Sequence, residues 1–171
     1  MFNFMQTNQI NFKSLPCLTI SYINGPAFGG GSELTSWTDL RISNQNTKVS
    51  FAHKHMGLIT SWNGGINLAG IVGKSRALEM MVTAGVYDGE KLVEMGYVNE
   101  QVDDHVDCPI ENENVQKLLK TYKGRSIQQS HAFKACMDPK IDQLDLASSL
   151  FGEELNVKSI DRALERVVKK K

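Results

Sequence analysis

Three consecutive glycines, Gly29, Gly30 and Gly31, stand just before Ser32 and Glu33 in the stretch INGPAFGGGSEL. Because glycine has no side chain to block the way to the backbone, this stretch predicts a loop with exposed amide groups. An apolar run precedes the loop and helix-start residues follow it, so its amides could stabilise an oxygen that becomes negative during a reaction. The alternative is a tight turn packed against another strand, and the loop alone does not decide between the two.

Side chains that could transfer protons beside such a loop are Glu33 and the histidines of the stretch FAHKHMG, His53 and His55. A histidine can take up or give a proton near neutral pH. The alternative for His55 is a surface histidine of a loop. Two histidines without a third ligand in the same motif fall short of a zinc site, so we expect no metal.

Three other uses of glycine-rich sequence do not fit. A dinucleotide fingerprint needs its third glycine at position 34, where this chain has Leu34. A nucleophile elbow needs its second glycine at the same position. The stretch GIVGKS at residues 70–75 is too short between its glycines for a phosphate-binding P-loop.

The composition is that of one globular domain without a large net charge. The chain has 171 residues, 41% of them hydrophobic, and 19 basic residues balance 19 acidic ones. This balance argues against nucleic acid and acidic membrane surfaces as partners. Three cysteines without a motif favour a reducing compartment, and no apolar run approaches the length of a membrane span. We therefore expect a cytosolic protein.

Strand and helix patterns alternate in the first hundred residues, as in α/β proteins. Caps mark several ends: Gly85 and Gly96 close two helices, and Asp88 begins the second of them. The expected strands are residues 17–25, 40–43, 49–53 and 97–102, and the expected helices are residues 32–37, 73–85 and 88–96.

Helical patterns alone follow, at residues 112–123, 126–137, 142–151 and 159–169. The last carries an apolar stripe, typical of a helix that packs against its own domain or another subunit. An acidic segment with a proline, residues 103–113, separates the two parts of the sequence. We therefore divide the chain into an α/β part, residues 1–104, and a helical part, residues 105–171.

Four stretches resemble the crotonase (enoyl-CoA hydratase/isomerase) superfamily in their order and spacing: INGPAFGGGSEL followed by Asp39, FAHKHMGLITSWNGG, VGKSRALEMMVTAG and LVEMGYVNEQV. Within it, HKHMGLITSW is similar to the ethylmalonyl-CoA decarboxylase branch. The resemblance implies an α/β fold, a crotonase-like ββα superhelix with a C-terminal helical tail for trimerisation or as a lid. It also implies that the family's N-terminal third is lacking, including a loop that donates a second oxyanion amide.

The resemblance also assigns roles to individual residues. The substrate would be an acyl-CoA thioester, with CoA as part of the substrate and no separate cofactor. Gly30 would donate one of the two amides to the thioester oxygen, Glu33 would match the first acid–base glutamate of the family, and His55 would stand at the position of the second. The remaining substrate-binding positions would be Phe28, Gly29, Gly31 and Trp62, although an aromatic beside a glycine loop is often simple packing.

A histidine in place of the second glutamate makes hydration by two carboxylates doubtful. Decarboxylation is less demanding, because loss of carbon dioxide leaves an enolate that needs only a proton. We therefore expect a carboxy-lyase of fatty acid metabolism that acts on ethylmalonyl-CoA or methylmalonyl-CoA. The alternatives are an enoyl-CoA hydratase/isomerase, or an inactive truncated homologue that acts in assembly. The resemblance further implies a homotrimer or hexamer, possibly with full-length relatives.

Overall fold

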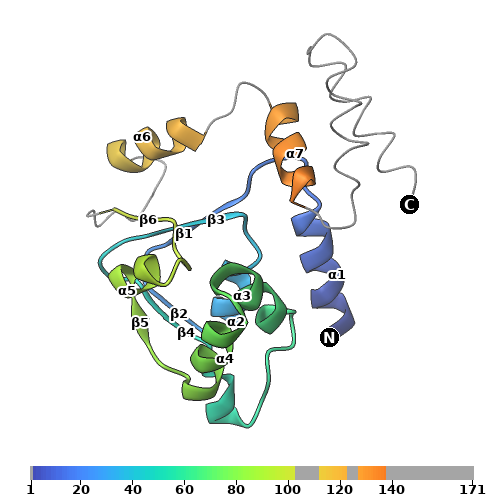
Figure 1. Cartoon of the computed structure of the whole chain (residues 1–171), viewed down its shortest axis with the longest axis vertical. Coiled ribbons are helices and arrows are strands. Elements are labelled where there is room, and N and C mark those ends of the chain that lie inside the picture. Colours follow the sequence, from blue (N-terminus) through green and yellow to red (C-terminus); the bar gives the residue numbers. More distant parts are fainter. Residues whose placement is uncertain (1, 103–111, 123–126, 138–171) are drawn as a thin grey trace. The chain divides into compact units, whose positions relative to one another are not determined.

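The computed structural model describes residues 2–102, 112–122 and 127–137, and the chain divides into two units (Figure 1). The first unit comprises Met1–Leu15 and Thr19–Leu118, and the second comprises Pro16–Leu18 and Leu119–Lys171. The helices expected at residues 142–151 and 159–169 lie outside the described residues.

Two sheets of three strands each form the framework of the first unit. One sheet has the order β1 (Ile20–Ile23), β3 (Leu40–Ser43) and β6 (Glu100–Gln101), and both neighbouring pairs are parallel. The other has the order β2 (Pro26–Phe28), β4 (Lys48–Ser50) and β5 (Tyr87–Asp88), with β2 and β4 parallel and β4 and β5 antiparallel. Thus the chain places β1, β2, β3 and β4 in alternate sheets, and a ββα unit results when α2 follows β2.

The helices next to these sheets come from the middle of the sequence. Figure 1 shows α2, α3 and α4 gathered on one side of the strands. The bounds are α1 Phe2–Lys13, α2 Gly30–Thr35, a 3-10 helix η1 at Ala52–Met56, α3 Gly64–Val72, α4 Lys74–Thr83 and α5 Gly89–Glu94. The helices of the last part that is described are α6 Glu113–Tyr122 and α7 Ile127–Cys136. No helix in the described ranges is long and apolar enough to cross a membrane.

The core of the first unit lies between the strands and α3, α4 and α5. Phe51 and Tyr97 meet edge to face at its centre, with ring centroids 6.2 Å apart. The buried residues of this core are Ile23, Val49, Phe51, Leu68, Ala77, Met80, Leu92, Tyr97 and Val98.

Several expected elements are confirmed. Strands form within residues 17–25, 40–43 and 97–102, and helices form at both positions expected between residues 112 and 137. The side chain of Asp88 caps α5 by accepting a hydrogen bond from the amide of Lys91 at 2.9 Å. Gly96 follows this helix with a φ of 71°, the left-handed backbone for which glycine is expected.

Other expectations were wrong in detail. The strand expected at residues 49–53 ends at Ser50, because the chain enters η1 at Ala52. The helix α4 is closed by Ala84, with a φ of 49°, and not by Gly85. Its buried residues are Ala77 and Met80, whereas Leu78 and Val82 are exposed.

Candidate active site

The glycine loop, residues 29–31, connects β2 to α2. Gly29 has a φ of 53°, and its amide donates to the carbonyl of Ser50 at 3.0 Å, next to the pairing of β2 with β4. The first amides of a helix have no partner within that helix. In the part of the chain that the structure describes, the amides of Gly30 and Gly31 make no hydrogen bond. The start of α2 therefore has two backbone donors without a hydrogen-bond partner among the described residues.

Glu33 lies on α2, four residues beyond the turn at Gly29, and its side chain is 1% exposed. The carboxylate accepts three backbone amides of the carboxylate loop, which we define as residues 61–64. Oε2 accepts from Trp62 at 2.8 Å and from Gly64 at 3.0 Å, and Oε1 accepts from Ser61 at 3.3 Å. Because Gly64 begins α3, the carboxylate also lies at the positive end of that helix.

Close packing seals this arrangement. Asn63 takes a left-handed backbone, with a φ of 61°, where the loop turns into α3. A Cβ atom at Gly64 would lie 2.5 Å from Cγ and 2.6 Å from Oε2 of Glu33, so only glycine lets the loop approach the carboxylate. The close approach of the carboxylate loop to Glu33 thus depends on the glycine at position 64.

The imidazole beside Glu33 belongs to His53. Its Nε2 lies 2.8 Å from Oε1 of Glu33, and the residue is 7% exposed. His55, which the sequence analysis placed in the site, is exposed on η1. A 3-10 helix has about three residues per turn, so residues two apart face different sides. The structure therefore brings His53 to Glu33, and it does not bring His55 there.

The two aromatic residues expected at the substrate are placed differently from each other. Phe28 is exposed at the end of β2. The ring of Trp62 covers the glycine loop, since a Cβ atom at Gly30 would lie 2.7 Å from its Cζ3 atom. Trp37 packs edge-on against Trp62 at 6.4 Å and donates from Nε1 to the carbonyl of Trp62 at 3.2 Å.

The helix α1 holds the other side of the carboxylate loop, which the sequence analysis did not foresee. Gln6 donates to the carbonyl of Ser61 at 3.3 Å, and Gln9 accepts from the side chain of Asn63 at 3.0 Å. Gln9 and Lys13 both donate to Oδ1 of Asn67 on α3, at 3.3 Å and 2.6 Å.

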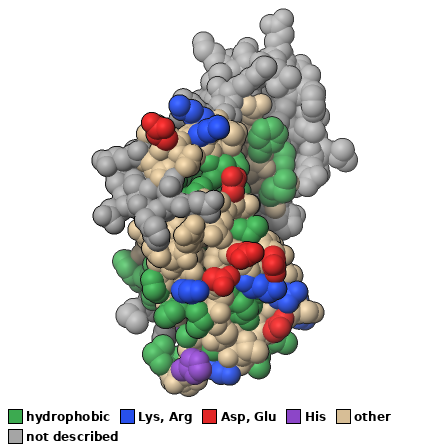
Figure 2. Space-filling model, turned by 90° about the vertical axis from the view of Figure 1, so that its left-hand side faces the viewer, with side chains coloured by type: hydrophobic (Ala, Val, Ile, Leu, Met, Phe, Trp, Pro, Cys, Tyr) green, Lys and Arg blue, Asp and Glu red, His purple; other side chains and the backbone are tan. Residues whose placement is uncertain are grey.

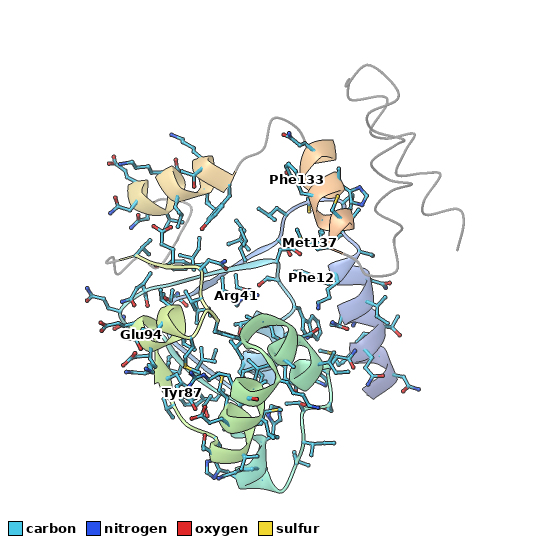
Figure 3. All side chains as sticks on the ribbon, viewed as in Figure 1. Phe12, Arg41, Tyr87, Glu94, Phe133 and Met137 are labelled. Atoms are coloured by element: carbon cyan, nitrogen blue, oxygen red, sulfur yellow. The ribbon has the colours of Figure 1, made fainter. Side chains whose placement is uncertain are left out.

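Phe12 of the same helix is labelled in Figure 3, and its ring centroid lies 6.4 Å from that of Trp37. The contacts of α1 are mostly polar. Its apolar residues therefore do not recur at helical spacing, and the sequence does not predict this helix.

A pocket of about 920 Å³ opens beside His53, between η1, the loop that follows it, α3 and α4. Its wall includes the backbone segment that binds Glu33, through Ser61 and Asn63. The apolar part of the wall comprises Phe51, Leu58, Ile59, Ile66, Met81 and Val82. Such a mostly apolar cavity with a few polar groups suits an organic ligand.

A buried polar cluster supports α2 from the core. The hydroxyl of Tyr97 donates to the carbonyl of Ser32 at 3.2 Å and lies 2.7 Å from Oγ1 of Thr35. Arg41 projects from β3 into the interior (Figure 3), 5.4 Å from the ring centroid of Tyr97. Burial raises the pKa of Tyr97 to about 12 and lowers the pKa of Arg41. The cluster therefore fixes the helix that carries Glu33.

The described ranges contain no candidate metal site, and one face of the molecule shows mixed charge. No three His, Cys, Asp or Glu side chains there come together in a way that could hold a metal ion. Figure 2 shows acidic and basic side chains next to one another on the face that it presents, without a patch of one sign.

Two alternating sheets, a glycine loop at a helix start and a glutamate behind it are the features that the resemblance to crotonases implies. The sequence matches the enoyl-CoA hydratase/isomerase family over residues 3–171, and the chain therefore belongs to this family. The bovine protein named ethylmalonyl-CoA decarboxylase is 28% identical over 167 residues, which are 93% of this chain and 55% of that protein. The zebrafish (Danio rerio) protein of the same name is 37% identical over 100 residues, 58% of this chain and 33% of its own length.

Solved structures confirm the fold. A putative enoyl-CoA hydratase from Thermobifida fusca, determined in complex with acetoacetyl-CoA, aligns with a TM-score of 0.67 at 19% identity. The alignment covers 96% of this chain and 58% of that chain. The chain thus spans little more than half the length of these relatives, or less.

Proposed function

We propose that the chain is the part of an acyl-CoA enzyme that forms and protonates a thioester enolate. The observation that carries the proposal is the amide of Gly30, which begins α2 without a partner among the described residues, on the same helix as Glu33 of the buried Glu33–His53 pair. A preorganised donor of this kind stabilises an oxygen only as it becomes negative, so it lowers the barrier to enolate formation. The CoA complex of the T. fusca relative supports a thioester as the ligand.

We propose decarboxylation of ethylmalonyl-CoA or methylmalonyl-CoA as the reaction. The bond between the α-carbon and the carboxylate breaks, carbon dioxide leaves, and the electron pair moves into the thioester enolate. The α-carbon then takes one proton, which re-forms the carbonyl. The names of the bovine and zebrafish relatives support this choice, and the mostly apolar pocket beside His53 suits the alkyl group.

Hydration or isomerisation of an enoyl-CoA is the second candidate, favoured by the structural relative that is a putative hydratase. The family's hydratases use two glutamates, whereas an imidazole lies 2.8 Å from Glu33 here. A third candidate is a non-catalytic role in an assembly, as a trimer or hexamer with itself or with full-length relatives. Both alternatives become outcomes of the same assay.

The assay measures carbon dioxide release from ethylmalonyl-CoA and methylmalonyl-CoA by the purified chain, with hydration of crotonyl-CoA in parallel. Carbon dioxide release without hydration supports the decarboxylase, and hydration alone supports the hydratase. The absence of both activities supports the non-catalytic role.

A matched pair of variants links the activity to the loop. Gly30→Ala would put a Cβ atom 2.7 Å from the ring of Trp62, whereas a Cβ atom at Gly70 on α3 would meet nothing within 4 Å. A displaced oxyanion donor costs about 10²-fold in rate, so we expect that loss for Gly30→Ala and little change for Gly70→Ala. Equal effects of the two variants would contradict the role of Gly30.

A further inference from the structure

The carboxylate of Glu33 is fully occupied by the protein itself. A carboxylate offers about four sites for hydrogen-bond donors. Three of them are taken by the amides of Ser61, Trp62 and Gly64, and the fourth by His53. A ligand could therefore reach a lone pair of Glu33 only after one of these contacts breaks. This is the environment of a group that holds others in place.

The imidazole of His53 is in the opposite situation. Its Nε2 faces the carboxylate of Glu33, so this nitrogen carries the proton that the pair shares. Its Nδ1 is buried and has no hydrogen-bond partner in the described part of the chain. Buried polar atoms without a partner are rare in folded proteins, and each calls for an explanation. Since His53 also lines the pocket, a ligand in the pocket supplies one.

We infer that Glu33 is a positioning residue and that His53 is the catalytic residue that delivers the proton to the bound thioester through Nδ1. The inference rests on the proposed function and names the proton donor of that same site. Because Nδ1 is covered from solvent, the ligand must displace the side chains over the ring when it enters. The proton is then protected from bulk water until the enolate forms.

The proposed step balances as follows. The imidazolium of His53 gives its Nδ1 proton to the α-carbon of the enolate, and the enolate electron pair forms the new C–H bond. The ring is left neutral, with its Nε2 proton still donated to Glu33. Solvent restores the Nδ1 proton after the product leaves. Throughout, the carboxylate of Glu33 accepts the Nε2 proton at 2.8 Å and holds the ring in place.

The first test is ¹⁵N NMR of the chain labelled at its histidines, at about pH 8.5, where ordinary histidines are neutral. We expect His53 as the tautomer with its proton on Nε2. In Glu33→Gln, the NH₂ group of the glutamine would face His53 and donate to Nε2 of the imidazole. Nε2 of His53 would then be an acceptor, so the ring proton should move to Nδ1. The exposed His55 should show no change. A wild-type His53 whose single ring proton is on Nδ1 would overturn the inference, and this readout of the wild-type chain requires no activity.

The second test compares His53→Gln with His55→Gln during decarboxylation in D₂O. A positioned donor delivers deuterium to one face of the α-carbon, so the wild-type chain and His55→Gln should give one product configuration. His53→Gln should be slower by at least about 10²-fold, and its residual product should be racemic at that carbon. Stereospecific product from His53→Gln would refute the proton role. A wild-type chain without any turnover would instead refute the proposed function, while the NMR result would still decide whether Glu33 positions His53.

Discussion

Gly64 and Glu33 show how one atom decides whether the site can form. The amide of Gly64 donates to Glu33 at 3.0 Å, and its Cα carries no side chain because the carboxylate occupies that space. Gly70 lies on the same helix, but a Cβ atom there would meet no atom of another element within 4 Å. Thus α3 has no room for a side chain at Gly64 and has room for one at Gly70.

We predict that Gly64→Ala destabilises the first unit by about 1–3 kcal/mol, the usual cost of forcing extra atoms into a packed interior. Gly70→Ala should be neutral or stabilising by up to about 1 kcal/mol, since alanine favours the helix. Urea unfolding of both variants measures the difference. Equal stabilities would show that the carboxylate of Glu33 does not lie against Gly64.

The sequence predicts only part of this site. Gly30 and Glu33 follow from a motif that is continuous in the chain. The choice between His53 and His55 depends on where β4 ends and on the pitch of η1, neither of which the pattern FAHKHMG contains. The amides that bind Glu33 come from residues 28 to 31 positions further on, and backbone donors leave no trace in side-chain identity.

Among the elements, those with strong end signals are predicted best. Asp88 and Gly96 mark α5, and Ile20, Tyr22 and Ile23, residue types that favour strands, mark β1. Helices α1 and α3 were not predicted, because their sequences lack a clear apolar period or a usual helix start. The first has a polar face, and the second begins with Gly64 and Gly65.

Helix α1 should stabilise the carboxylate loop through Gln9. This side chain is buried and exchanges hydrogen bonds with Asn63 and Asn67. We predict that Gln9→Ala lowers the free energy of unfolding by about 1–3 kcal/mol, because buried polar partners are left unpaired.

Thr7→Ala is the matched control on the same helix. The hydroxyl of Thr7 is exposed and, among the described residues, bonds only the carbonyl of Asn3, so the change should stay within about 0.5 kcal/mol. Thermal unfolding of both variants checks the expectation. A loss as large for Thr7→Ala as for Gln9→Ala would mean that α1 contributes by its helical backbone alone.

For the first unit as a whole, the buried cluster of Tyr97 and Arg41 links stability to pH. The pKa of Tyr97 is raised from 10.0 to about 12, so the unfolded chain loses this proton first as the pH rises. The stabilisation is therefore complete below pH 10 and is lost as the pH rises towards 12. By linkage the loss amounts to roughly 1–3 kcal/mol.

We predict that Tyr97→Phe flattens this alkaline decline, because the variant has no phenol to ionise. It should also be less stable at neutral pH by about 1–3 kcal/mol, since the carbonyl of Ser32 and the hydroxyl of Thr35 each lose a buried partner. Urea unfolding of both proteins between pH 8 and 11 gives the difference in slope. Parallel curves would show that Tyr97 is not buried with a neutral hydroxyl.

The most direct measurement follows the backbone amides of the glycine loop by ¹⁵N NMR while butyryl-CoA, the product of ethylmalonyl-CoA decarboxylation, is added. It reports directly on the oxyanion donors and does not require turnover. We predict a saturable downfield shift of the Gly30 amide proton, as expected for a new hydrogen bond to the thioester oxygen, with Gly70 unchanged. Saturable binding that leaves the Gly30 amide unmoved, or no binding at all, would contradict the proposed site.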